Sequence, residues 1–161
     1  VGGRAVWTEP VYGNIYDHFA CDFDYGDELH VISMCRQWGN TDMKVAVEMV
    51  GTKGTAVMEQ DGRLYITGEN RWIYRERRLD SRQREQVDLV EGIRSGNLPN
   101  DARRIAESTL TAIMGREAAY SGQVVDWEQI MNAKQDLAPK KFEFGPLPMR
   151  PVPRPGEYKL I

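Results

Sequence analysis

The chain is poor in the residues that build metal-bound or disulfide-rich domains. Among its 161 residues there are only two cysteines, Cys21 and Cys35, and two histidines, His18 and His30. A structural zinc site takes four Cys or His ligands, and disulfide scaffolds are much richer in cysteine. We therefore expect no metal site and no disulfide framework.

An excess of positive charge and long apolar runs are also missing. The 21 basic and 24 acidic side chains give a formal net charge of -3, so no overall positive field attracts a phosphate backbone or an anionic membrane. No apolar run approaches the roughly 20 residues that span a bilayer, and no signal-peptide pattern opens the chain. We expect neither nucleic acid nor a membrane as a partner.

The glycine pattern of a nucleotide-binding loop is the third absence. A dinucleotide site needs glycines where a strand turns into a helix, because the pyrophosphate must approach backbone N–H groups. The nearest candidate, Gly51-Thr52-Lys53-Gly54, is followed by β-like sequence and predicts a hairpin turn. We expect no bound cofactor and no catalytic residue in this chain.

What the sequence does contain predicts one α+β domain. Its length and 41% hydrophobic content are sufficient for one core. Apolar residues alternate with period two in the first half and recur every three to four residues in the second, so strands precede helices. We expect this domain over residues 1–138. Residues 139–161 hold six prolines, which cannot donate ladder hydrogen bonds, and predict an extended tail along a surface.

Alternation and turn residues place the strands, and capping residues place the helices. The expected strands are residues 1–7, 16–25, 29–36, 44–50, 54–60, 63–67 and 71–75, the last four forming an antiparallel meander. Helices are expected after the capping pair Asp80 and Gln83 up to residue 95, from about 100 to 120, and after the pair Asp126 and Gln129.

The strands 16–25 and 29–36 predict a hairpin with a two-residue turn at Gly26-Asp27. The predicted pairs are Tyr25 with Glu28, Cys21 with Ile32, Phe19 with Met34, His18 with Cys35, and Asp17 with Arg36 as an ion pair. This register puts the two cysteines on opposite faces of the sheet, so we expect both thiols to be free. The pairing of His18 with Cys35 could activate a nucleophile, but a packed thiol is the favoured interpretation.

Aromatic and hydrogen-bonding residues gather at the open end of this hairpin and in the loop before it. They are Trp7, Tyr12, Tyr16, Asp17, His18, Arg36, Gln37 and Trp38. Such a mixture suits a sugar, whose C–H face stacks on aromatic rings while its hydroxyls need oriented partners. A subunit interface is enriched in the same residue types. Composition leaves both interpretations open.

Four segments resemble one protein family and together extend over nearly the whole chain. They are VGGRAVWTEPVYGNIYDHFACDFDY, SMCRQ, VGTKGTA and QVDLVEGIRSGNLPNDARRIAESTLTAIMGREAAYSGQVVDWEQI. They resemble the C-terminal domain of the glucose-fructose oxidoreductase/inositol dehydrogenase/MocA (Gfo/Idh/MocA) family. The stretch from Tyr12 to Ala20 is more similar to a subgroup of bacterial sugar dehydrogenases.

The resemblance implies an open, mainly antiparallel β-sheet with helices packed on one face. It implies a parent NAD(P)-dependent oxidoreductase of a sugar or polyol, whose Rossmann domain, missing from this sequence, holds NAD or NADP and the catalytic lysine. This chain would bind substrate and form a homo-oligomer through the sheet. A substrate-side role is implied for Tyr12, Tyr16, Asp17 and His18, and our hairpin pairing extends it to Arg36.

A second interpretation comes from a different class of protein. The same fold could serve as a stand-alone binding or assembly module without catalysis. The sequence leaves open the substrate, the choice between NAD and NADP, and a cytoplasmic or periplasmic location.

Overall fold

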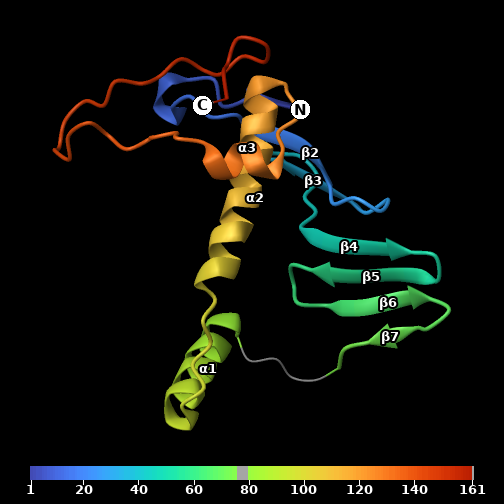
Figure 1. Cartoon of the computed structure of the whole chain (residues 1–161). Coiled ribbons are helices and arrows are strands. Elements are labelled where there is room, and N and C mark those ends of the chain that lie inside the picture. The colour runs from blue at the N-terminus through green and yellow to red at the C-terminus, as the bar shows by residue number, and fades with distance from the viewer. Residues whose placement is uncertain (76–79, 161) are drawn as a thin grey trace. The chain divides into compact units, whose positions relative to one another are not determined.

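The computed structural model describes residues 1–75 and 80–160, and their contacts divide the chain into two compact units. Unit 1 comprises residues 1–39 and 101–161, and unit 2 comprises residues 40–100. Unit 1 contains β1 (Gly2–Gly3), η1 (Pro10–Tyr12), β2 (His18–Asp24), β3 (His30–Arg36), α2 (Ala102–Ser121) and α3 (Trp127–Asn132) (Figure 1). Unit 2 contains β4 (Ala46–Gly51), β5 (Gly54–Glu59), β6 (Leu64–Gly68), β7 (Trp72–Ile73) and α1 (Ser81–Ser95).

The α+β class predicted from the sequence is confirmed, but the described strands form two antiparallel sheets. One has the strand order β1-β2-β3 and the other β4-β5-β6-β7. A single open sheet is therefore not what these residues show. The assignment of one domain to residues 1–138, with a separate tail, stays a prediction.

In unit 1 the hairpin of β2 and β3 has a register one residue away from the predicted one. The N–H of Tyr25 donates to the carbonyl of Leu29 at 2.9 Å, so the loop has three residues, 26–28, rather than two. Gly26, Asp27 and Glu28 all have positive φ angles. A three-residue loop is not expected from the sequence, because a glutamate such as Glu28 rarely takes the left-handed conformation.

The new register corrects every predicted pair in this hairpin. The observed pairs include His18 with Arg36, Phe19 with Cys35, Cys21 with Ser33 and Asp24 with His30. Asp17 lies opposite Gln37, whose N–H donates to the Asp17 carbonyl at 2.8 Å, so the predicted pairing of Asp17 with Arg36 is wrong.

The two cysteines lie on the same face of this sheet, contrary to the prediction. Cys35 is opposite Phe19, which shares its face with Cys21 because the two are separated by two positions along β2. Both thiols are nevertheless free within the described chain, as expected. His18 projects to the other face, so the register removes the predicted pairing of His18 with Cys35.

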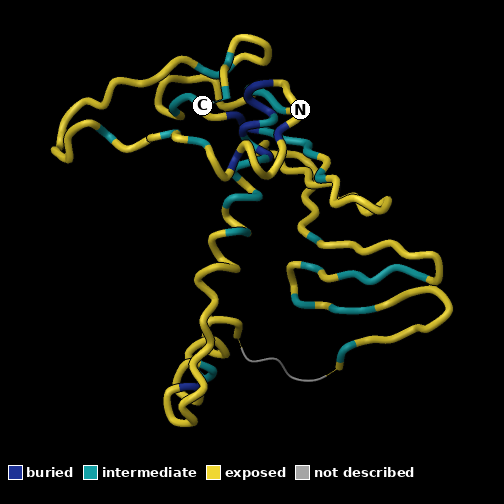
Figure 2. The backbone as a smooth tube through the Cα atoms, in the orientation of Figure 1, coloured by how far each residue is buried: buried dark blue, intermediate teal, exposed yellow. Residues whose placement is uncertain are grey.

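The core of unit 1 lies where the C-terminal half of α2 packs on β2 (Figure 2). Tyr16, Ala119 and Tyr120 are its buried hydrophobic residues. Val152 and Tyr158, from the C-terminal tail, pack against this cluster and form part of the core. Residues 133–160, all described, contain neither helix nor strand.

Both helix caps read from the sequence are confirmed. The Asp80 side chain accepts hydrogen bonds from the N–H groups of Arg82 and Gln83, and α1 ends at Gly96 in the left-handed conformation. Asp126 and Gln129 form a reciprocal capping box at the start of α3. The meander of unit 2 is also confirmed, with strand ends within one or two residues of those predicted.

Candidate functional site

The aromatic and polar residues at the open end of the β2–β3 hairpin do come together in unit 1. We call this group the aromatic cluster; it comprises Trp7, Tyr12, Asp17, His18, Arg36, Gln37 and Trp38. Trp7, Tyr12 and Asp17 lie between β1 and β2, and His18 is the first residue of β2. Arg36 is the last residue of β3, and Gln37 and Trp38 follow it.

Asp17 is the anchor of the aromatic cluster and is only 4% exposed. Its Oδ2 accepts hydrogen bonds from the backbone N–H groups of Ala5, Val6 and Trp7, at 2.8, 2.6 and 2.9 Å. Burial on its own raises the pKa of this carboxyl, but the hydrogen bonds from His18 and these three N–H groups outweigh it, so the pKa lies well below its ordinary value. Asp17 is therefore ionised and fixes the fold of the loop before β2.

His18 and Trp38 are held against this carboxylate. His18 Nδ1 lies 2.7 Å from Asp17 Oδ1, and the indole N–H of Trp38 donates to the same oxygen at 3.4 Å. The two rings meet edge to face, with centroids 5.5 Å apart. Arg36 lies over the Trp38 ring, 5.8 Å from its centroid, which is within the range of a cation–π contact.

Trp7 and Tyr12 form the other half of the aromatic cluster. Their ring centroids are 4.4 Å apart in an edge-to-face arrangement, and the Trp7 indole N–H donates to the carbonyl of Gln37. Arg4, which the sequence analysis did not single out, holds this loop through hydrogen bonds to the carbonyls of Trp7 and Glu9, at 2.6 and 2.8 Å, and to that of Gly13. An arginine among turn residues gives no sequence signal for this role.

Tyr16 is the predicted site residue that the structure places elsewhere. Its ring is buried against Tyr120, with centroids 4.7 Å apart, and its hydroxyl donates to the carbonyl of Pro153 at 2.9 Å. Burial raises the pKa of this hydroxyl. Tyr16 therefore joins the core to the tail, while Tyr12, Asp17, His18 and Arg36 all lie in the aromatic cluster.

A second polar site, absent from the sequence analysis, surrounds Glu117 on α2. The Glu117 side chain is 2% exposed; it accepts hydrogen bonds from Arg116 at 2.7 Å and from the hydroxyl of Tyr158 at 2.8 Å. Gln135 bonds both Arg116 and Tyr158. Burial, and then the bond to Glu117, raise the pKa of Tyr158. No local motif marks this network, because Gln135 and Tyr158 are far from Arg116 and Glu117 in the sequence.

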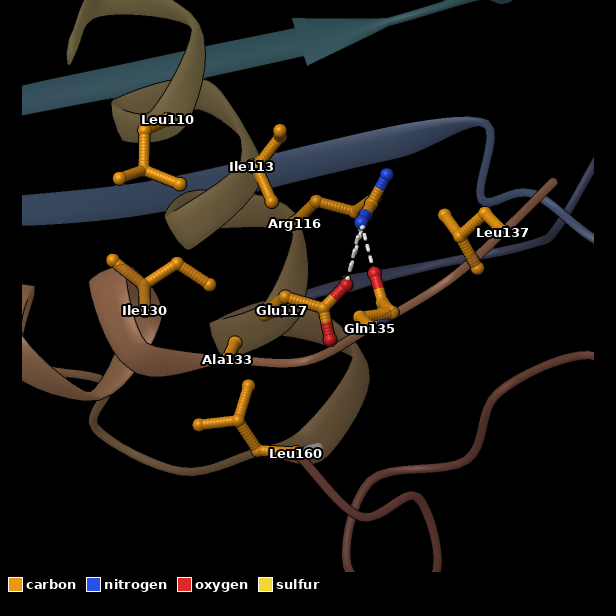
Figure 3. A pocket seen from close by; sticks show the side chains of 9 residues that line it. All are labelled: Leu110, Ile113, Arg116, Glu117, Ile130, Ala133, Gln135, Leu137 and Leu160. Atoms are coloured by element: carbon orange, nitrogen blue, oxygen red, sulfur yellow. Dashed lines mark hydrogen bonds and ion pairs between the residues drawn. The ribbon is translucent and has the colours of Figure 1, made fainter. Parts of the chain in front are cut away.

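Three members of this network, Arg116, Glu117 and Gln135, line a cavity of about 260 Å³ (Figure 3). Its remaining walls are apolar and come from Leu110, Ile113, Ile130, Ala133, Leu137 and Leu160. Arg116 and Glu117 form an ion pair, so neither charge in this network needs a ligand to neutralise it. The network joins α2 to the tail.

No cluster of three or more His, Cys, Asp or Glu side chains in residues 1–75 and 80–160 could hold a metal ion. No helix in this part of the chain is long and apolar enough to cross a membrane. Comparisons with protein-family models, curated proteins and solved structures find no match to this chain.

Proposed function

We propose that this chain is the substrate-binding and oligomerisation domain of an NAD(P)-dependent sugar or polyol oxidoreductase of the Gfo/Idh/MocA type, with an open sheet backed by helices in the intact protein. The aromatic cluster is the observation that supports the proposal. In the parent enzyme a separate Rossmann domain holds the nicotinamide. The present residues orient the carbinol carbon for hydride transfer.

The aromatic cluster offers both kinds of contact that a carbohydrate needs. The residues Trp7, Tyr12 and Trp38 are each between 36% and 38% exposed, and an aromatic ring can stack on the C–H face of a sugar. His18 is the polar side chain beside them, and its exposed fraction is also 36%. A flat, wet binding surface of this kind has modest affinity, with Kd on the order of 1 mM, or about -4 kcal/mol.

Tryptophan fluorescence of the full 161-residue chain tests this proposal. Titration with methyl glycosides of glucose, galactose, mannose and xylose, and with myo-inositol and sorbitol, should give a saturable change for at least one compound. Trp38→Ala should weaken that binding about fivefold to tenfold by removing one stacking surface. Trp127→Ala is the matched control, because Trp127 has similar exposure (42%) and lies on α3.

Two outcomes would count against the proposal. If no compound binds, the aromatic cluster is better explained as a protein interface or as part of a non-catalytic module. If NAD(H) or NADP(H) gives a specific saturable signal in calorimetry, the assignment of all cofactor binding to a separate domain is wrong.

A further inference from the structure

His18 differs from the other members of the aromatic cluster in having one ring nitrogen fixed and one available. Nδ1 lies 2.7 Å from Asp17 Oδ1. Within residues 1–75 and 80–160, no protein group forms a hydrogen bond with Nε2. The side chain is 36% exposed. The edge of the ring with Nε2 lies beside Gly3, where a Cβ would come within 3.1 Å of Nε2.

The surroundings of Asp17 determine which nitrogen of His18 carries the proton. Oδ2 accepts three backbone N–H groups and Oδ1 accepts the indole N–H of Trp38, so the carboxylate acts only as an acceptor. The short contact between Asp17 and His18 therefore requires a proton on Nδ1. In the neutral imidazole the lone pair is then on Nε2.

The position of the ring is fixed as well as its tautomer. Trp38 meets the His18 ring at 71° and bonds the same carboxylate oxygen. Arg36 covers Trp38, and His18 lies opposite Arg36 across the strands. An acceptor whose proton and orientation are set before binding loses little freedom when it takes up a ligand.

We infer that Nε2 of His18 accepts a hydrogen bond from one hydroxyl group of a sugar or polyol that stacks on the aromatic cluster, with Asp17 as the positioning residue that holds the tautomer. This inference rests on the proposed function and names the specificity-determining atom of that site. The ligand hydroxyl must donate the hydrogen bond, so a ligand with an ether oxygen at the same position should bind more weakly.

The tautomer can be tested without any ligand. Long-range ¹H–¹⁵N correlation of the full chain, at a pH where His18 is neutral, should show Nδ1 protonated and Nε2 unprotonated. His30→Gln removes the other histidine and assigns the signals. A neutral His18 protonated on Nε2 would overturn the inference directly.

The hydroxyl contact is tested by combining a protein variant with a ligand variant. The probe is the glycoside or polyol from the panel above that binds most tightly, together with its mono-O-methyl ethers. His18→Phe keeps an aromatic ring beside Trp38 and removes the acceptor, so binding should weaken about fivefold to tenfold. One of the methyl ethers should bind the wild type as weakly as the unmodified probe binds His18→Phe. The affinity of that ether should not fall further in His18→Phe, because the two changes remove the same hydrogen bond.

His30→Phe is the matched control, because His30 is the other partly exposed histidine and lies at the far end of the same hairpin, beside Asp22. It should leave binding unchanged. If Trp38→Ala weakens binding but His18→Phe does not, the hydroxyl contact is wrong and the proposed function stands. If no compound of the panel binds at 100 mM, on the order of a hundred times the expected Kd, both are overturned.

Discussion

The Asp17 side chain stabilises the loop before β2, because three consecutive backbone N–H groups donate to one of its oxygens. Asp17→Ala leaves these donors without their partner in a buried place and should lower the free energy of unfolding by about 3 kcal/mol. Urea denaturation followed by circular dichroism measures this.

Asp22→Ala provides the matched control for this loss. Asp22 lies on the same strand but is 54% exposed, and its ion pair with His30 is a surface contact. The expected loss is below about 0.5 kcal/mol. Equal losses in the two variants would contradict the anchoring role of Asp17.

The same carboxylate should make stability depend on pH. Burial opposes ionisation of Asp17, but its hydrogen bonds outweigh burial and depress the pKa in the folded state. Such a group contributes stability that is fully present above the unfolded-state pKa of about 3.9 and is lost as the pH falls through the lower, folded-state pKa. The urea midpoint of the wild type should therefore decrease below about pH 4 more steeply than that of Asp17→Asn, which has no carboxyl to protonate. Parallel curves would contradict this.

The two thiols should differ in reactivity although they lie on one face of the sheet. Cys35 is exposed, whereas Cys21 is half-buried and donates to the carbonyl of Gly115 at 3.4 Å. Burial raises the pKa of Cys21, which reduces its reactive thiolate. Maleimide should label Cys21→Ser at Cys35 at least about tenfold faster than Cys35→Ser at Cys21. Similar rates would indicate that α2 does not cover Cys21.

At the residue scale, Asp17 and His18 are predicted as site residues from clustering and resemblance, and only Arg36 is added through the predicted hairpin register. The structure pairs Asp17 with the N–H groups of residues 5–7 and with His18. The cross-strand partner of Asp17 depends on the length of the loop at residues 26–28, where Glu28 has a positive φ angle. Its bonds to residues 5–7 depend on the fold of a second loop, which no pattern in the sequence indicates.

At the level of the elements, the sequence predicts interactions between residues close together in the chain but not those between distant residues. Asp80, Asp126 and Gln129 cap their helices as predicted, because a cap involves atoms only two or three residues apart. The contacts of the tail with Tyr16 and Glu117 join residues more than 40 positions apart, and no periodicity in the sequence indicates them.

Docking of the tail can be tested at the end of α2. Gly122 and Gly96 both end a helix with φ of 72°, where an alanine is strained. A Cβ on Gly122 would lie 2.9 Å from Cβ of Pro155, whereas one on Gly96 would meet nothing within 4 Å. Gly122→Ala should therefore displace the tail, and Gly96→Ala should not.

Amide exchange of Gly156 measures this displacement. Its N–H donates to the carbonyl of Ser121 at 2.9 Å, so exchange should accelerate about tenfold in Gly122→Ala, corresponding to a loss of about 1.4 kcal/mol. In Gly96→Ala the rate should stay at the wild-type value. Equal acceleration in both variants would show that strain at the cap, and not contact with the tail, is responsible.

At the scale of the whole molecule, the separation into two units was not predictable from alternation. Period two identifies strands but says nothing about which strands share a sheet, and the break falls between β3 and β4. The registers of β4–β7 divide the side chains of this sheet between two faces. Apart from glycines, one face carries only apolar residues: Val47, Met49, Ala56, Met58, Leu64, Ile66 and Trp72. The other face is mixed and carries Glu48, Thr55, Glu59 and Thr67 together with Ala46, Val50, Val57, Tyr65 and Ile73.

The apolar face of this sheet is the surface through which we expect the chain to self-associate, as the proposed function requires. Met49 is 68% exposed and Trp72 48%, and a contiguous exposed apolar face is typical of a protein interface. A lysine at position 49 would place a charge in that interface, so Met49→Lys should weaken association at least tenfold in sedimentation velocity. Glu48→Lys adds a lysine at the neighbouring position on the mixed face and should leave association unchanged. A wild-type chain that remains monomeric at high concentration, or equal weakening by both lysines, would remove this face as the oligomer interface.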